Sequence, residues 1–318
     1  MDNTVAEFDL IERIRRRVAT RDDVLLGIGD DAALLQPPAG MQLVVAMDTL
    51  NSGVHFPPET APADIGWKAL AVNLSDLAAM GALPAWCTLS LSLPDADGEF
   101  VDGFLDGFLA LASQHDLALV GGDTTRGPLS ICVAVHGFID AGQALRRDGA
   151  RAGDDLWVSG TLGDAAAALS YWQSGGAIDP TLRMRLDRPT PRVSLGHVLR
   201  GIATSCIDVS DGLLADLGHV CKASGVGALV DVDALPASPT LRSGFDAEAR
   251  RLLQATGGDD YELCFTAPAT SREAVIEAAS THAPVARIGR IVAGRGVSAV
   301  DAQGVAWQPS VAGFRHFE

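Results

Sequence analysis

Residues 43–48 read LVVAMD, a short apolar run that ends on an aspartate. A run of this length and composition predicts a buried strand. Downstream, residues 63–80 predict a helix, because Pro62 precedes its first turn and Gly81 follows its last one, as the ends of helices prefer. A strand followed by a helix indicates a chain in which the two kinds of element alternate.

The alternation continues along the chain. Residues 101–114 predict a second amphipathic helix, and strands are expected at 117–120 and 131–139. In the second half, we expect helices at 164–172, 193–201, 212–223 and 272–280, strands at 156–159, 206–209, 261–266 and 286–292, and a hairpin at 297–307. This order of elements predicts a mixed α/β (α+β) fold.

A change of composition predicts a domain boundary near the middle of the chain. Residues 142–153, GQALRRDGARAG, are polar and basic between two apolar regions, as linkers between domains often are. A length of 318 residues is sufficient for two domains with sizeable cores. We therefore expect one domain over residues 1–145 and a second over residues 146–318.

The chain is strongly acidic. Its 40 aspartates and glutamates outnumber its 24 lysines and arginines, which gives a formal net charge of −16. This charge disfavours a nucleic acid or an anionic membrane as partner. Phosphate substrates would also be repelled unless a divalent metal bound both the carboxylates and the phosphate. A simpler interpretation, that the acidity only aids solubility, is equally compatible with the composition.

The sequence also bears on the compartment. No apolar run approaches the roughly 18 residues of a membrane span, and residues 1–17 lack the apolar centre of a secretion signal. The five cysteines are dispersed and form no CxxC pair, so neither a zinc ribbon nor a disulfide framework is supported. We expect a cytoplasmic protein.

The residues that carry chemistry are aspartates at the ends of predicted strands. They stand beside glycine or a small hydroxyl residue in GIGDDAAL, AMDTL, NLSDLAAMG, VGGDTTRG and IDVSDGLLADLG. Glycine lets the main chain approach a ligand closely, and Mg²⁺ prefers oxygen ligands. One Asp-Gly pair alone equally indicates an ordinary turn. The set predicts carboxylates that converge in one cleft and hold divalent cations: Asp30, Asp31, Asp48, Asp76, Asp123, Asp208 and Asp211.

Asp76 is the most informative of these aspartates. It lies in the middle of a predicted helix, within the mostly apolar run ALAVNLSDLAAMG. Aspartate is a poor helix former and is costly to bury without a partner. A metal ion would remove that cost, whereas a solvated helix face is the alternative.

Two well-known phosphate-binding arrangements are absent from the sequence. There is no GxxxxGK[ST] stretch, and Lys68 and Lys222 are the only lysines, which excludes a P-loop. No HRD and DFG motifs of a protein kinase occur either. Phosphoryl transfer would therefore depend on metals, main-chain amides and arginines. The candidate arginines are Arg126, Arg146, Arg147 and Arg151. We expect a functional role for Arg126 and Arg147, whereas the other two are expected to be ordinary surface residues.

Six motifs together resemble a known family. GIGDDAALL, DTLNSGVHF, KALAVNLSDLAAMGA, GGDTTRGPLSI, IDVSDGLLADLGH and GGDDYELCFT follow one another between Gly27 and Thr266. This ordered set closely resembles the thiamine-monophosphate kinases, relatives of aminoimidazole ribonucleotide synthetase and selenide water dikinase. The resemblance implies Mg²⁺-dependent, in-line transfer of the γ-phosphoryl group of ATP to thiamine monophosphate, which gives thiamine diphosphate. It also implies a homodimer in which the mixed sheets of two N-terminal α/β domains form a barrel, and a C-terminal α+β domain.

The resemblance also assigns roles to residues of this chain. It implies metal ligation by Asp31, Asp48, Asp76, Asp123, Asp208 and Asp211, with Asp30 beside them, and a catalytic role for Asp76, Asp123 and Asp211. It implies contacts with ATP from Asp31, Gly122, Asp123, Arg147 and Ser210. Contacts with thiamine monophosphate are implied for His55, Asp259 and Phe314, with Trp307 as the alternative to Phe314.

The chain departs from the family pattern at two places. Ala46 and Met47 precede Asp48 where relatives carry hydroxyl residues, so a metal there would have only the main-chain carbonyl of a residue such as Met47. In GGDDYEL, Asp259 replaces a glutamate and is shorter by one methylene group.

Two other functions stay open at this stage. Another ATP-dependent enzyme of the superfamily, similar to aminoimidazole ribonucleotide synthetase, is disfavoured by the GGDDYEL and DTLNSGVHF motifs. A selenide water dikinase is disfavoured because the first cysteine is Cys87. A non-catalytic nucleotide-binding relative is kept open by Ala46 and Met47.

Overall fold

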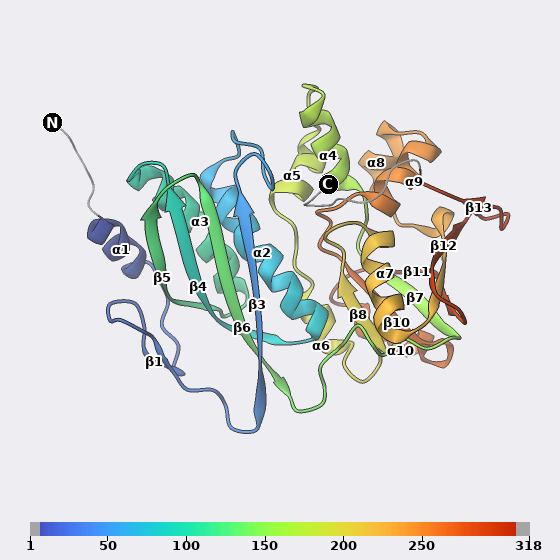
Figure 1. Ribbon diagram of the computed structural model, residues 1–318, viewed down its shortest axis with the longest axis horizontal. Coiled ribbons are helices and arrows are strands. Elements are labelled where there is room, and N and C mark those ends of the chain that lie inside the picture. The colour runs from blue at the N-terminus through green and yellow to red at the C-terminus, as the bar shows by residue number, and fades with distance from the viewer. Residues whose placement is uncertain (1–6, 310–318) are drawn as a thin grey trace. The chain divides into compact units, whose positions relative to one another are not determined.

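The computed structural model describes residues 7–309 (Figure 1), and its internal contacts divide the chain into two compact units. The first unit comprises Met1–Leu77 and Leu83–Ala141, and the second comprises Ala78–Ala82 and Gly142–Glu318. The chain thus changes unit at the start of the polar segment 142–153. The bounds 1–145 and 146–318 stay a prediction for domains that fold independently.

The first unit is built on a four-stranded mixed sheet with the order β3-β6-β4-β5. β3 pairs antiparallel with β6, β6 pairs antiparallel with β4, and β4 runs parallel to β5. Two short strands, β1 and β2, form a separate antiparallel pair. The elements of this unit are α1 (Glu7–Arg15), β1 (Val24–Leu26), β2 (Leu34–Leu35), β3 (Met41–Asn51), α2 (Pro62–Met80), β4 (Leu83–Leu93), α3 (Gly98–Gln114), β5 (Ala118–Arg126) and β6 (Ser130–Asp140).

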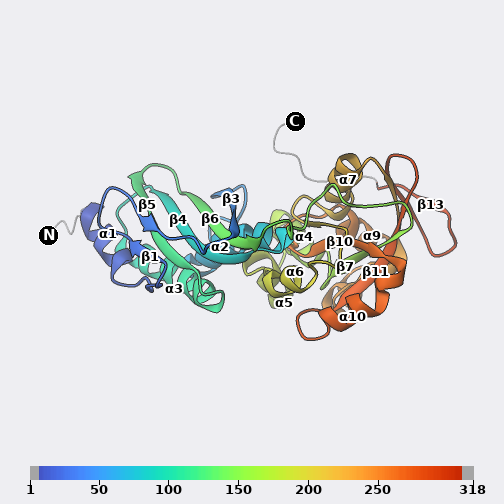
Figure 2. The ribbon, with the colours of Figure 1, turned by 90° about the horizontal axis from the view of Figure 1, so that it is seen from below.

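Helices α2 and α3 lie behind this sheet in Figure 1, and Figure 2 shows α3 below β4 in the view from below. The side chain of Leu77 on α2 lies directly against Gly137 of β6. The two helices approach each other closely because Gly66 and Gly107 carry no side chain: a Cβ atom there would lie 2.0 Å from the Phe104 carbonyl oxygen and 1.7 Å from that of Ala63, respectively. This packing fixes α2, which carries Asp76, against the sheet.

The second unit contains a seven-stranded sheet with the order β13-β12-β9-β11-β7-β10-β8. All its strand pairs are antiparallel except β9 and β12. Its strands are β7 (Asp154–Ser159), β8 (Ser205–Asp208), β9 (Gly227–Asp231), β10 (Leu263–Pro268), β11 (Val285–Val292), β12 (Gly296–Val300) and β13 (Ala306–Trp307). Its helices are α4 (Asp164–Gln173), α5 (Pro180–Asp187), α6 (Val193–Val198), α7 (Leu213–Ser224), α8 (Pro239–Gly244), α9 (Ala247–Thr256) and α10 (Arg272–Ala279), with 3₁₀ turns at Val232–Ala234 and Ala269–Ser271.

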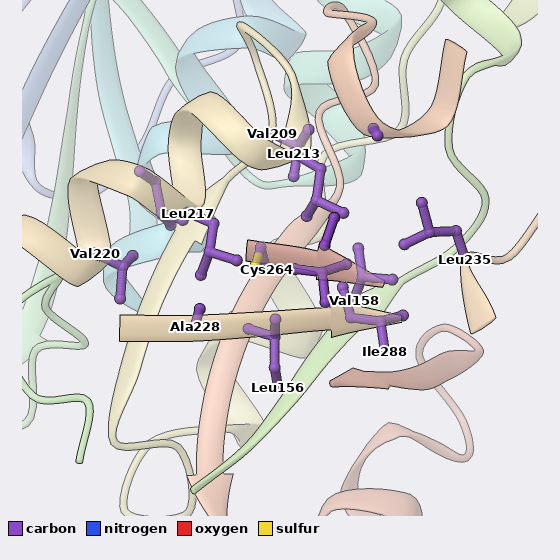
Figure 3. Close-up of a cluster of buried hydrophobic side chains, with 14 of the residues drawn as sticks. Leu156, Val158, Val209, Leu213, Leu217, Val220, Ala228, Leu235, Cys264 and Ile288 are labelled. Carbon is purple, nitrogen blue, oxygen red and sulfur yellow. The ribbon is translucent and has the colours of Figure 1, made fainter. Parts of the chain in front are cut away.

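The core of the second unit lies between α7 and the sheet (Figure 3). Leu213, Leu217 and Val220 of α7 face Val158 and Cys264 from the strands, and all five side chains are buried. Burial of such aliphatic side chains contributes about 1.5–3 kcal/mol each. The helix is therefore held firmly, and with it the loop that leads from β8 into α7.

All five cysteines are free. Cys87, Cys206, Cys221 and Cys264 are buried, whereas Cys132 is half-buried. Burial raises the pKa of the Cys87 and Cys206 thiols far above the ordinary cysteine value.

The predicted fold class is confirmed, since each unit combines helices with a mixed sheet. The strand expected at 43–48 lies within β3, the helix expected at 63–80 coincides with α2 except for its first residue, and the hairpin at 297–307 is formed by β12 and β13. The elements that were not expected are α1, β1, β2 and β4 in the first unit and α5, β9, α8 and α9 in the second. None of the helices within residues 7–309 is both long and apolar enough to cross a membrane.

Three details of the prediction were wrong. Asp48 and Asp123 lie inside strands and not at their ends, because β3 keeps pairing with β6 as far as Asn51 and β5 keeps pairing with β4 as far as Arg126. The strand expected from Tyr261 begins only at Leu263, because the positive φ of Tyr261 (51°) interrupts extended structure. The helix expected to reach residue 201 ends at Val198.

Candidate functional site

A cleft in the first unit brings two of the aspartate motifs together. It has a volume of about 870 Å³ and is lined by one face of α1, by residues 27–33 and by Gly121 and Gly122 of β5. A smaller adjoining pocket shares Gly122 and adds Asp123. GIGDDAA and GGD, about ninety residues apart in sequence, therefore border one continuous depression.

Gly122 permits the strand geometry that places Asp123 at this cleft. Its φ is +152°, and a Cβ atom at this position would lie 1.8 Å from the Leu89 carbonyl oxygen of β4. A side chain at residue 122 would thus collide with the neighbouring strand. Glycine at residue 122 therefore lets β5 lie close to β4 while its main chain lines the cleft.

Asp30 and Asp31 are exposed at the same cleft. The main-chain N–H of Asp31 donates to Oδ1 of Asp30 at 2.9 Å, which orients the first carboxylate. Among the residues that line the cleft, Arg15 of α1 alone is basic. Arg15 was not singled out in the sequence, because nothing in the local pattern of α1 indicates that it lies beside a loop at residues 27–33.

Asn73 of α2 binds the main chain at Asp48 and lies three residues before Asp76 on the same helix. The main-chain N–H of Asp48 donates to Oδ1 of Asn73 at 2.9 Å, and Nδ2 of Asn73 donates to the Ala69 carbonyl at 2.9 Å. Asn73 is fully buried, whereas Asp76, three residues further along the helix, is half-buried. Asp76 therefore lies at the edge of the buried face of α2 and not within it.

In the second unit, Asp208 and Asp211 flank the turn between β8 and α7. Asp208 is buried, and Asp211 is half-buried. A third carboxylate, Asp216, accepts hydrogen bonds from the main-chain N–H groups of Ser210, Asp211 and Gly212 at 3.0, 3.1 and 3.1 Å. Burial, together with the charges of Asp208 and Asp211, raises the pKa of Asp216 to about 7. Asp216 belongs to the motif IDVSDGLLADLG, but no role was predicted for it from the sequence.

The GGDDYEL segment is bonded to the same turn. The N–H of Asp259 donates to the Ser210 carbonyl at 2.9 Å, and that of Tyr261 donates to the Val209 carbonyl at 2.8 Å. Asp259 and Tyr261 both have positive φ, 67° and 51°, and the Tyr261 hydroxyl donates to Oδ1 of Asp259 at 3.1 Å. The side chain of Asp259 is therefore held in a defined position beside the turn.

A buried carboxylate next in sequence anchors this segment. Glu262 is fully buried and accepts hydrogen bonds from Arg185 at 2.8 Å and twice from Arg192 at 2.6 Å. The Ser159 hydroxyl donates to it at 2.5 Å. Arg192 is the last residue of the RPTPR loop, so this loop has a structural role that the sequence did not reveal.

The remaining predicted residues are placed as follows. His55 accepts a hydrogen bond at Nδ1 from the Asn51 N–H, and its carbonyl accepts one from Lys68. Arg126 and Arg147 are exposed; Arg126 donates to the Pro94 carbonyl at 3.2 Å. The indole of Trp307 donates to Glu248 at 2.8 Å, and Phe314 lies outside the described residues.

The candidate metal ligands thus fall into two sets. Asp30, Asp31, Asp48, Asp76 and Asp123 belong to the first unit, and Asp208 and Asp211 belong to the second. Within residues 7–309, no group of three or more histidine, cysteine, aspartate or glutamate side chains is already arranged to hold a metal ion. The convergence of the two sets in one cleft therefore stays a prediction.

Two family models match the chain: "AIR synthase related protein, N-terminal domain" over residues 29–139, and "AIR synthase related protein, C-terminal domain" over residues 151–302. Curated relatives include the thiamine-monophosphate kinase of Salmonella typhimurium, 51% identical over 275 residues and 85% of each chain. That of Bacillus subtilis is 36% identical over 300 residues, which are 90% of this chain and 91% of the relative.

Solved structures agree with these matches. The crystal structure of thiamine-monophosphate kinase from Stenotrophomonas maltophilia superposes with a TM-score of 0.88 at 60% identity, over 95% of this chain and 98% of the other. A structure described as "AaThiL complexed with AMPPCP and TMP" superposes with a TM-score of 0.78 at 33% identity, over 98% and 97% of the two chains. The chain belongs to the AIR synthase related family and, within it, to the thiamine-monophosphate kinases.

Proposed function

We propose that the protein transfers the γ-phosphoryl group of ATP to thiamine monophosphate and forms thiamine diphosphate. The observation that carries this proposal is the match over 98% of the chain to a relative whose structure holds AMPPCP and TMP. The 51% identity to a curated thiamine-monophosphate kinase supports the same activity. ATP is then the co-substrate and thiamine monophosphate the acceptor.

The aspartates fit Mg²⁺ as the metal. Their carboxylates are oxygen donors, the ligands that this hard cation prefers, and Asp30, Asp31, Asp48 and Asp123 are exposed. Asp76, Asp208 and Asp211 complete the set, and Met47 has only its main-chain carbonyl to offer. Bound Mg²⁺ would neutralise the charge of the two phosphate-bearing substrates, which repel each other otherwise.

The side chains of the protein then have mainly to position the substrates. The attacking phosphate oxygen of thiamine monophosphate is already ionised, so in-line transfer needs alignment more than a strong base. Arg15, Arg147 and the main chain at Gly122 are suited to phosphate, and the Ser210 hydroxyl to a nucleotide oxygen. Because Nδ1 of His55 accepts a hydrogen bond from Asn51, the neutral ring carries its proton on Nε2 and can donate it to the substrate.

The experiment that tests this function is an assay of the purified protein with ATP, Mg²⁺ and thiamine monophosphate, in which thiamine diphosphate is separated by chromatography. We expect ADP and thiamine diphosphate in equal amounts. Formation of ADP only with formylglycinamidine ribonucleotide would assign the chain to the other enzyme class of the superfamily. ATP binding without any turnover would assign it to the non-catalytic relatives.

A homodimer is part of the proposal. β3 is an edge strand of its sheet, and Leu43, Val45 and Met47 on one of its faces are 48%, 57% and 64% exposed. An exposed apolar edge strand is normally covered by a partner, so we infer that a second copy pairs here and that the two sheets form a barrel. Sedimentation analysis should give a dimer for the wild type and a monomer for Val45→Glu.

The cytoplasm is the compartment in which we place this activity. The five free cysteines suit a reducing environment.

A further inference from the structure

One side chain of the second unit organises the main chain around the predicted ligand Asp211. Oδ2 of Asp216 accepts three hydrogen bonds, from the successive N–H groups of Ser210, Asp211 and Gly212, at 3.0, 3.1 and 3.1 Å. Asp216 is itself only 3% exposed. The N–H groups at a helix N-terminus have no partner within the helix; here the three N–H groups before α7 all donate to one side chain of that helix.

The rest of this turn is engaged as well. The N–H of Val209 donates to the Glu262 carbonyl at 2.8 Å, and the carbonyls of Val209 and Ser210 accept from Tyr261 and Asp259. Every N–H from residue 209 to residue 212 therefore has a partner inside the second unit. A phosphate group cannot bind these amides without displacing Asp216, so the turn can reach a ligand mainly through its side chains, above all Ser210 and Asp211.

Gly212 shows that the conformation of the turn is specific. Its φ is +121°, and a Cβ atom there would lie 2.7 Å from the Thr256 carbonyl oxygen. Two features therefore fix this turn: Gly212 allows the chain to pass close to the end of α9, and Asp216 accepts the three N–H groups of residues 210–212.

We propose that Asp216 is a positioning residue of the phosphoryl-transfer site, which fixes the main chain of residues 210–212 and thereby the side chains of Ser210 and Asp211. This proposal rests on the proposed function, in which Ser210 contacts ATP and Asp211 binds Mg²⁺. The side-chain oxygen of Asp216 accepts all three N–H groups at once, whereas an alanine at this position could accept none of them.

The test compares Asp216→Ala and Asp216→Asn with Asp246→Ala as the matched control. Asp246 also accepts a hydrogen bond from a helix N-terminus, from the Ala249 N–H at 2.8 Å, but the helix that it caps is α9 and not α7. The measurements are hydrogen exchange of the amides at residues 210–212, Mg²⁺ affinity in the presence of AMPPCP by calorimetry, and kcat and KM for thiamine monophosphate.

For Asp216→Ala, we expect faster exchange of the three amides, and Mg²⁺ affinity and kcat both lower by about 10- to 100-fold, as for residues that orient metal ligands. KM for thiamine monophosphate should change by less than about threefold, because Asp216 itself does not contact this substrate. Asp216→Asn, which keeps an oxygen acceptor, should lie between Asp216→Ala and the wild type. Asp246→Ala should match the wild type in all these measurements.

Wild-type exchange at residues 210–212 or wild-type Mg²⁺ affinity in a folded Asp216→Ala would overturn the proposal. If Asp216→Ala does not fold, Asp216→Asn decides: it supports the proposal only if its Mg²⁺ affinity falls while its unfolding temperature stays close to that of Asp246→Ala. A wild type that binds Mg²⁺ with AMPPCP but makes no thiamine diphosphate refutes the proposed function alone, because exchange and affinity still report on Asp216.

Discussion

The main-chain N–H of Asp48 and the side-chain oxygen of Asn73 are joined by a hydrogen bond of 2.9 Å that links β3 to α2. Asn73 is fully buried, and its amide nitrogen is bound in turn by the Ala69 carbonyl. The oxygen and the nitrogen of this side-chain amide thus both form hydrogen bonds. Asn73 therefore fixes the position of Asp48 relative to the helix that carries Asp76.

Replacement of Asn73 should therefore disturb both stability and the site. For Asn73→Ala, we expect the free energy of unfolding to fall by about 1–3 kcal/mol, because the Asp48 N–H loses its partner. Mg²⁺-dependent activity should fall as well, since Asp48 is no longer held. Urea unfolding and a Mg²⁺ titration of the activity measure the two effects. An unchanged Mg²⁺ requirement would show that Asn73 serves folding only.

Asp76→Asn should damage turnover far more than folding. The substitution keeps the size of the side chain at a half-buried position but removes its charge, so we expect kcat at limiting Mg²⁺ to fall by about 100-fold or more, as when a group that stabilises transition-state charge is removed. The unfolding temperature should change by only a few degrees. Asp97→Asn is the control, since it alters an exposed helix cap where asparagine serves equally well. Wild-type activity of Asp76→Asn at limiting Mg²⁺ would show that Asp76 is not a metal ligand of the site.

Two neighbouring glycines provide a matched pair of substitutions. Gly122→Ala should destabilise the protein by about 3 kcal/mol or more, because it combines a positive φ with a collision at the Leu89 carbonyl. Gly121→Ala should be tolerated, since its Cβ atom would meet nothing closer than Thr88 at 4.0 Å. Thermal unfolding of both variants is the measurement, and equal unfolding temperatures would contradict the geometry of β5.

The ion pairs of Asp155 predict a pH dependence of stability. The guanidinium of Arg272 donates two hydrogen bonds to Asp155 at 2.5 and 2.8 Å, and with Arg287 it holds the pKa of this buried carboxyl below its ordinary value. The unfolded chain has an aspartate pKa of about 3.9, so the stabilisation is complete above that pH and is lost as the pH falls through the lower pKa of the folded state.

Asp155→Asn should accordingly lower the free energy of unfolding by about 2 kcal/mol at pH 7, and by less at pH 3. Urea unfolding of both proteins at the two pH values measures the difference. The same loss at pH 3 and pH 7 would mean that packing of the side chain, and not its charge, stabilises this position.

Local patterns in the sequence were sufficient to predict many of the helices and strands. Pro62 and Gly81 bracket α2 as helix punctuation requires, and the apolar run at 43–48 does form a strand. Ser238 and Asp246 cap α8 and α9 with side-chain hydrogen bonds; both are local signals from which these unexpected helices could have been found.

What the sequence could not show depends on contacts between distant residues. Asp123 was expected at the end of a strand, but its strand continues because Ser90 of β4 pairs beside it. Asn73 acts on a residue 25 positions away, and Arg192 pairs with a glutamate 70 positions away. Such partners are determined by the packing of the whole unit, and the residues that neighbour Asn73 or Arg192 in sequence do not indicate them.

The four buried thiols have a practical consequence. Alkylation requires a thiolate that a reagent can reach. Cys87, Cys206, Cys221 and Cys264 are buried, and burial raises the pKa of each thiol, so they meet neither condition in the native state. These sulfurs lie in β4, β8, α7 and β10, one in the first unit and three in the second. The rate at which each becomes labelled therefore reports how often its surroundings open, so a pulse of alkylating reagent followed by mass spectrometry would time the opening of each unit separately.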